Sequence, residues 1–87
     1  MKINLKQQQL IDELLAKVKE RYPEIVVRNM EPTVDSPDDI WIHVLADMDE
    51  ERQMELSSYA AELETDILTD YGYAFTIMPH NPNTIYA

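Results

Sequence analysis

Apolar residues recur at helical spacing near the start of the chain. Leu10 and Leu14 lie four positions apart, and further apolar residues continue the same stripe on either side. Asn4 and Gln7 have the spacing of a capping box, in which each side chain binds the other residue's backbone N–H. This pattern predicts a helix over residues 5–22 with one buried face.

A second and longer helical pattern occupies the middle of the chain. Its apolar stripe advances in steps of four, three and four residues through Leu56, Ala60, Leu63 and Ile67. Asp47 followed by Glu50 predicts the N-terminal cap, and the neighbouring acids favour the positive end of the helix dipole. Gly72 is the single glycine of the sequence and suits the left-handed conformation that ends many helices. A long helix is therefore predicted between Asp47 and Gly72.

Three short stretches rich in β-branched or alternating apolar residues have the character of strands. They cover residues 24–30, 40–45 and 73–78. The polar, proline-containing loop over residues 31–38 is short enough to join an antiparallel pair. The second and third stretches are separated by the long helix, so they can run parallel. Residues 79–87 are predicted to be an irregular C-terminal tail.

The element order α-β-β-α-β predicts a single α+β domain over residues 1–87. Its three-stranded mixed sheet has both helices packed on one face. The residues assigned to the covered face are Ile40, Ile42, Val44, Phe75 and Ile77. The residues assigned to the opposite face are Trp41, His43, Leu45, Thr76 and Met78.

Charge is distributed unevenly along the sequence. The formal net charge is −10, and residues 31–70 hold thirteen acidic residues against one basic residue, Arg52. Nucleic-acid affinity depends on lysine and arginine contacts with phosphates, so this region repels a nucleic acid. Two interpretations stay open: an acidic face that keeps the protein soluble, and a surface that docks a basic partner.

Composition excludes several kinds of site and location. One glycine cannot build a phosphate-binding loop, and the absence of cysteine removes disulfides, thiolate metal sites and cysteine nucleophiles. No apolar run approaches the roughly 20 residues that span a bilayer, and the polar N-terminal sequence differs from a signal peptide. We expect a cytoplasmic protein with no cofactor, no membrane contact and no nucleic-acid partner.

Three aspartates precede the second predicted strand. Carboxylates such as Asp35, Asp38 and Asp39 hold Mg²⁺ in phosphoryl-transfer sites, but aspartates beside prolines also form turns. Residues 36–42 (SPDDIWI) are similar to the strand entry of the minimal nucleotidyltransferase family, and residues 60–77 are similar to its helix and third strand.

The resemblance to nucleotidyltransferases implies a strand-helix-strand fold and a two-metal catalytic site. The family's Gly-Ser pair has no counterpart near residues 28–30, and Trp41 stands where the second acid of its Asp-x-Asp motif falls. Asp39 alone carries over, so the resemblance implies a degenerate enzyme or a nucleotide and Mg²⁺ binder. Asp38 and Asp39 are the alternative metal ligands.

Trp41 is the most informative residue on the predicted open face. It belongs either to a secondary core or to an interface, where tryptophan is enriched. His43 and His80 have no close histidine or cysteine in the sequence, so a transition-metal site would require distant partners. We expect His43 to be a half-buried sheet residue and His80 a loop residue, with no metal site.

These patterns favour a non-catalytic, acidic interaction module. Its predicted interaction face consists of Trp41, His43, Leu45 and Met78. We expect the occupant to be a protein partner or a second copy of the chain. The degenerate nucleotidyltransferase described above is the alternative function.

Overall fold

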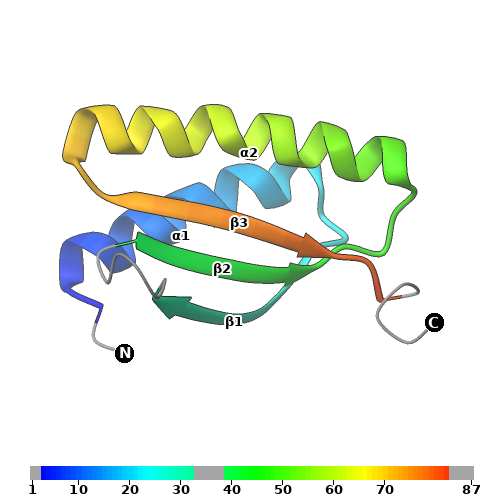
Figure 1. Cartoon of the computed structure of the whole chain (residues 1–87), viewed down its shortest axis with the longest axis horizontal. Coiled ribbons are helices and arrows are strands. Elements are labelled where there is room, and N and C mark those ends of the chain that lie inside the picture. Colours follow the sequence, from blue (N-terminus) through cyan, green and yellow to red (C-terminus); the bar gives the residue numbers. More distant parts are fainter. Residues whose placement is uncertain (1–2, 33–38, 83–87) are drawn as a thin grey trace.

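The chain folds into two helices and a three-stranded sheet (Figure 1). The computed structural model describes residues 3–32 and 39–82. Its elements in chain order are α1 (Leu5–Arg21), β1 (Val26–Pro32), β2 (Asp39–Leu45), α2 (Glu50–Tyr71) and β3 (Ala74–His80). The strand order is β1-β2-β3, with β1 antiparallel and β3 parallel to the central β2. The predicted fold class and both pairings are confirmed.

The helices lie on one side of the sheet, with α2 running along β3 and α1 behind the strands in Figure 1. The core fills the space between these layers and contains the five residues assigned to the covered face, all of them buried. The buried members from the helices are Leu10, Ile11, Leu14, Val18, Leu56 and Ala60. The alternation in β2 and β3 therefore separates a buried face from an open one.

The start of α1 forms the predicted capping box. The Asn4 side chain accepts a hydrogen bond from the backbone N–H of Gln7 at 2.7 Å. The Gln7 side chain in turn accepts from the backbone N–H of Asn4 at 3.0 Å. Two of the N–H groups that a helix leaves unpaired at its start are thereby satisfied.

The start of α2 differs from the prediction. Asp49, and not Asp47, is the N-cap, because its side chain accepts the backbone N–H of Arg52 at 2.8 Å. The helix therefore begins at Glu50, and the acids Glu50 and Glu51 occupy its first turn. These acids favour the positive end of the helix dipole, as predicted, with the start of the helix moved two residues along the chain.

Arg52 ties this end of α2 to the segment after α1. Its guanidinium donates two hydrogen bonds to the carboxylate of Glu24, at 2.9 and 3.0 Å, and one to the backbone carbonyl of Arg21 at 3.2 Å. The guanidinium also lies 4.7 Å from the ring centroid of Tyr22. These hydrogen bonds from Arg52 hold the pKa of Glu24 below its ordinary value. The one basic residue of the acidic region therefore has a structural role.

Two strand boundaries also correct the prediction. β1 begins at Val26 and continues through Glu31 to Pro32, so these last two residues are not part of the loop. β3 continues through Pro79 to His80, so the irregular tail predicted from residue 79 is wrong for these two positions. Residues 83–87 of that tail lie outside the described residues.

Gly72 ends α2 in the left-handed conformation, with φ 77° and its N–H bonded to the Leu68 carbonyl at 2.9 Å. We expect Gly72→Ala to lower the free energy of unfolding by about 1 kcal/mol, since a β-carbon is strained at positive φ. No described atom lies within 4 Å of the position that the added carbon takes, so the cost is conformational and not steric. Urea denaturation measures the change, and an unchanged or raised stability would contradict it.

The open face of the sheet as candidate interaction site

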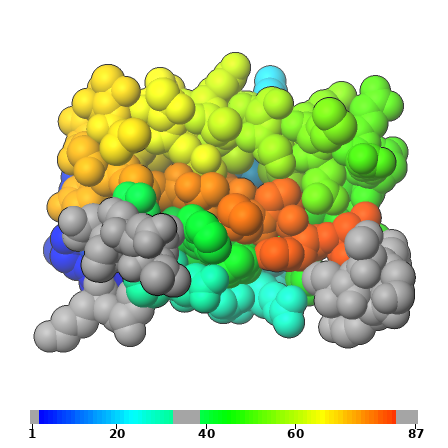
Figure 2. Space-filling model, viewed as in Figure 1, coloured from blue at the N-terminus to red at the C-terminus, as the bar shows by residue number. Residues whose placement is uncertain are grey.

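The candidate site is the sheet face opposite the helices, called here the open face. It carries alternate side chains from all three strands, and Figure 2 looks onto it, with β3 in orange below α2. Its members are Val26, Asn29 and Glu31 of β1, Trp41, His43 and Leu45 of β2, and Thr76, Met78 and His80 of β3. No helix or strand of the described residues covers it.

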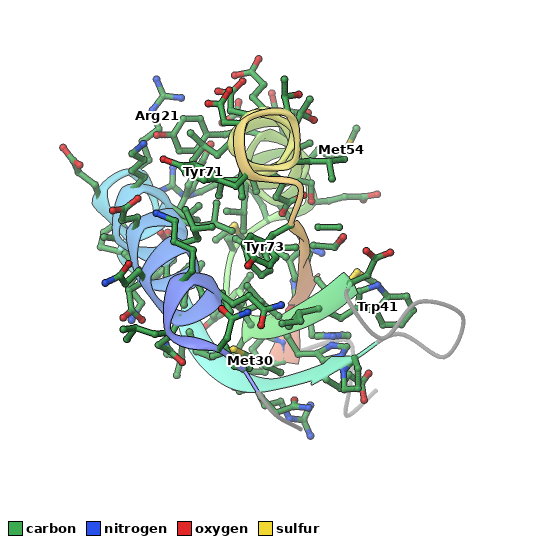
Figure 3. The ribbon with its side chains drawn as sticks, turned by 90° about the vertical axis from the view of Figure 1, so that its left-hand side faces the viewer. Arg21, Met30, Trp41, Met54, Tyr71 and Tyr73 are labelled. Carbon is green, nitrogen blue, oxygen red and sulfur yellow. The ribbon has the colours of Figure 1, made fainter. Side chains whose placement is uncertain are left out.

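Trp41 projects from this face into solvent. Its side chain points away from α1 in Figure 3, and the residue is 38% exposed and lies outside the core cluster of the described residues. Its indole meets the His43 ring edge to face, with centroids 6.3 Å apart. Leu45 and Met78 are half-buried on the same face, and Val26 is 57% exposed. The open face therefore presents a discontinuous apolar surface centred on β2.

A chain of hydrogen bonds crosses the open face from β1 to β3. Glu31 Oε1 lies 2.8 Å from Nε2 of His43, and Nδ1 of the same ring lies 2.8 Å from Nε2 of His80. His43 is a half-buried sheet residue, as predicted, whereas His80 ends β3 and does not lie in a loop. The parallel register, which pairs His43 with Met78 and Leu45 with His80, brings the two rings together.

The carboxylate of Glu31 determines which ring nitrogen donates and which accepts in this series of hydrogen bonds. An ionised carboxylate only accepts hydrogen bonds, so Nε2 of His43 carries a proton and donates it. In the neutral form of the ring, Nδ1 then has a lone pair, which accepts the N–H of His80. The contact between the two histidines is partly buried, whereas the contact of His43 with Glu31 is exposed, with the Glu31 side chain 49% exposed.

Sequence reasoning could have found His80. Thr76, Met78 and His80 continue a single alternation, and proline is tolerated on an edge strand because its missing N–H can face outward. Pro79 does occupy such an edge and pairs with Val44. Because the strand was predicted to end before Pro79, His80 was not assigned to the open face.

Both edges of the sheet are modified in ways that weaken pairing with a further strand. On β3, Glu64 of α2 accepts the backbone N–H of Ile77 at 2.7 Å. On β1, the register shifts between Val27 and Asn29, and Pro32 lies at the end of the strand. Bulges, prolines and carboxylates of this kind are common defences against edge-to-edge pairing. The open face is therefore more accessible to a partner than either edge.

The Glu64 carboxyl has a pKa above its ordinary value, because burial outweighs the hydrogen bond from Ile77. The folded chain therefore binds this proton more tightly than the unfolded chain does. The stability that protonated Glu64 contributes is complete below the ordinary pKa of a glutamate, and it is lost as the pH rises through the pKa of Glu64 in the folded chain.

Glu64→Gln removes the charge and keeps an oxygen that can accept the Ile77 N–H. We expect the variant to melt at a higher temperature than the wild type at pH 7, with the advantage shrinking toward about pH 4. Glu62→Gln, at an exposed position of the same helix, is the control. A lower melting temperature at pH 7 would mean that the charged hydrogen bond outweighs burial.

Negative charge is concentrated on α2 and not on the open face. Six acids of this helix are exposed: Glu50, Glu51, Glu55, Glu62, Asp66 and Asp70. The side chains assigned above to the open face include one acid, Glu31, and two histidines. The open face is therefore less repulsive to another acidic protein than the outer surface of α2 is.

A groove of about 850 Å³ runs between α2 and the end of β3, beside the open face. Ser57 and Ser58 line it from the helix, and His80 and Asn81 from the strand side. Both serines occupy the interior of α2, so the groove has no strained turn that exposes a nucleophile. The rim residue Met54 is 65% exposed and projects to the same side as Trp41 in Figure 3.

The aspartate hypothesis is only partly covered by the structure. Asp39 begins β2 and pairs with Ala74, while Asp35 and Asp38 lie outside the described residues. Over residues 3–32 and 39–82, no three His, Cys, Asp or Glu side chains converge to hold a metal ion. A magnesium site at Asp38 and Asp39 stays a prediction.

Comparison with known protein families, curated proteins and solved structures gives no match to this chain. The resemblance to nucleotidyltransferases therefore also stays a prediction. Among the described helices, neither α1 nor α2 combines the length and apolar character needed to cross a bilayer.

Proposed function

We propose that this chain is a non-catalytic interaction module that binds a second copy of itself through the open face. The observation that carries the proposal is the exposed Trp41 on a sheet face that no described helix or strand covers. Apolar patches of this kind on a small domain usually mark an interface, and tryptophan is enriched among the residues that contribute most to binding.

A second copy suits this surface for two reasons. A two-fold axis places the open face of one copy against the open face of the other. The apolar residues of β2 therefore meet the same residues of the partner copy. The open face also carries less charge than α2, so contact through it keeps the acidic helices at the periphery of the pair.

The size of the open face predicts a weak and reversible dimer. Three strands of seven residues make a footprint of about 15 by 23 Å, from the usual strand spacing and rise per residue. Two such faces with part of the α2 rim bury on the order of 1,000 Å² in total, the lower limit for specific interfaces. We expect a dissociation constant in the micromolar range.

Sedimentation velocity over a series of protein and salt concentrations tests this proposal. The charge of −10 on each copy opposes association at low ionic strength, and screening weakens that repulsion near 0.1 M salt. We expect monomers at low concentration and low salt, and dimers at about 0.5 mM protein in 0.15–0.3 M salt. A chain that stays monomeric under all of these conditions would contradict the proposal.

A further inference from the structure

We propose that His43 and His80 form half of a binding site for a divalent transition-metal ion such as Zn²⁺, which two copies of the chain complete between their open faces. This inference rests on the proposed self-association and adds a ligand to it. The ligands are Nδ1 of His43 and Nε2 of His80, which face each other on the open face. The site does not involve Asp38 or Asp39.

The surroundings of His43 resemble those of a metal-binding histidine. Such a residue usually donates its second ring N–H to a carboxylate, which fixes the tautomer and makes the free nitrogen a better ligand. Glu31 occupies that position, 2.8 Å from Nε2 of His43. The lone pair of His43 is therefore fixed on Nδ1, on the side that faces His80.

A metal ion can replace the proton that lies between the two rings. His80 moves its proton from Nε2 to Nδ1, and both facing nitrogens then offer lone pairs, with no net release of a proton from the neutral pair. Zinc binds imidazole nitrogen at 2.0–2.1 Å, so tetrahedral geometry places two such nitrogens about 3.3 Å apart. They are now 2.8 Å apart, and small side-chain rotations provide the difference.

One copy leaves the coordination incomplete. Zinc takes four ligands at a structural site, and the described residues of one chain bring no third His, Asp or Glu ligand to this pair. His43 is the middle one of the three open-face residues of β2, which is the middle strand. A two-fold axis that overlaps the two open faces therefore passes close to His43 and brings the histidine pairs of both copies together.

Four imidazole nitrogens then surround a single ion. Facing sheets pack about 10 Å apart, so side chains from each sheet meet near the middle plane. The ion also adds positive charge between two chains that each carry −10, which reduces their mutual repulsion. Zinc is therefore expected to strengthen the same dimer that forms weakly without it.

The test is sedimentation velocity of the full chain with zinc chloride or with EDTA, combined with the visible absorption of added Co²⁺. His80→Gln removes one ligand and keeps an amide that can bind His43. Thr76→Ala, an exposed position on the same face, is the matched control. We expect zinc to lower the wild-type dimer dissociation constant at least tenfold, with one ion per two chains and an intense tetrahedral Co²⁺ band.

Each variant is compared with itself in zinc and in EDTA, because both positions lie on the open face. Thr76→Ala should keep the zinc response, and His80→Gln should lose it. A wild-type dimer that forms equally well in zinc and in EDTA would overturn the metal site and leave the proposed function standing. A zinc response that survives in His80→Gln, or one ion per chain without association, would also overturn it. Association that requires both zinc and His80 would support the metal site and contradict metal-free self-association.

Discussion

Leu56→Ala is expected to lower the free energy of unfolding by about 3 kcal/mol, within the range measured for leucine residues removed from packed cores. Leu56 is 0% exposed and belongs to the cluster that joins α2 to the sheet. The alanine loses the transfer free energy of the removed atoms and leaves a cavity that its neighbours fill only in part. Urea denaturation followed by circular dichroism gives the value.

Met54→Ala is the control for this prediction. Met54 lies two residues from Leu56 on the same helix but is 65% exposed, so its replacement should change stability by less than about 0.5 kcal/mol. Equal effects of the two substitutions would mean that α2 does not bury the face described above.

Trp41→Glu is expected to weaken self-association at least tenfold and to leave the monomer folded. The substitution removes the largest apolar side chain of the open face and places a carboxylate where the partner copy presents apolar groups. Trp41 is not part of the core cluster, so the melting temperature of the monomer should change little. Sedimentation velocity measures the association, and thermal melting at low concentration measures the fold.

Leu5→Glu provides the same change of charge at another exposed apolar position. Leu5 is 76% exposed and begins α1, which packs on the opposite side of the sheet. This variant should associate as the wild type does. If both variants lose association equally, the added charge and not the open face explains the effect.

Local sequence signals predicted most of the fold. Asn4 with Gln7 marked the start of α1, and Gly72 marked the end of α2, because caps depend on a few adjacent residues. The alternation through Ile40, Ile42 and Val44 separated the two faces of β2, since strand side chains point to opposite sides in turn.

The start of α2 was harder to place, because Asp47 and Asp49 are both capping residue types and Asp47 alone has an acid, Glu50, three residues later. The structure selects Asp49 through its hydrogen bond to the N–H of Arg52, whose side chain reaches Glu24 across 28 positions of sequence. Propensity within the helix contains no information about that distant partner.

The contact of His43 with His80 could not be predicted for a related reason. The two residues are 37 positions apart, and their meeting depends on the register of parallel strands, which no local pattern specifies. The open face itself was predicted from alternation, but the hydrogen-bond chain that starts at Glu31 required the structure.

Distances between two spin labels test the face-to-face dimer most directly. The chain has no cysteine, so Thr76→Cys places one label per copy on the open face, and Ala16→Cys places one on α1. Sheets packed about 10 Å apart predict labels at position 76 within about 25 Å of each other. The shortest dimension of the chain is 19 Å, so labels at position 16 should lie roughly 35 Å or more apart across two stacked layers. Shorter distances at position 16 than at position 76 would contradict association through the open face.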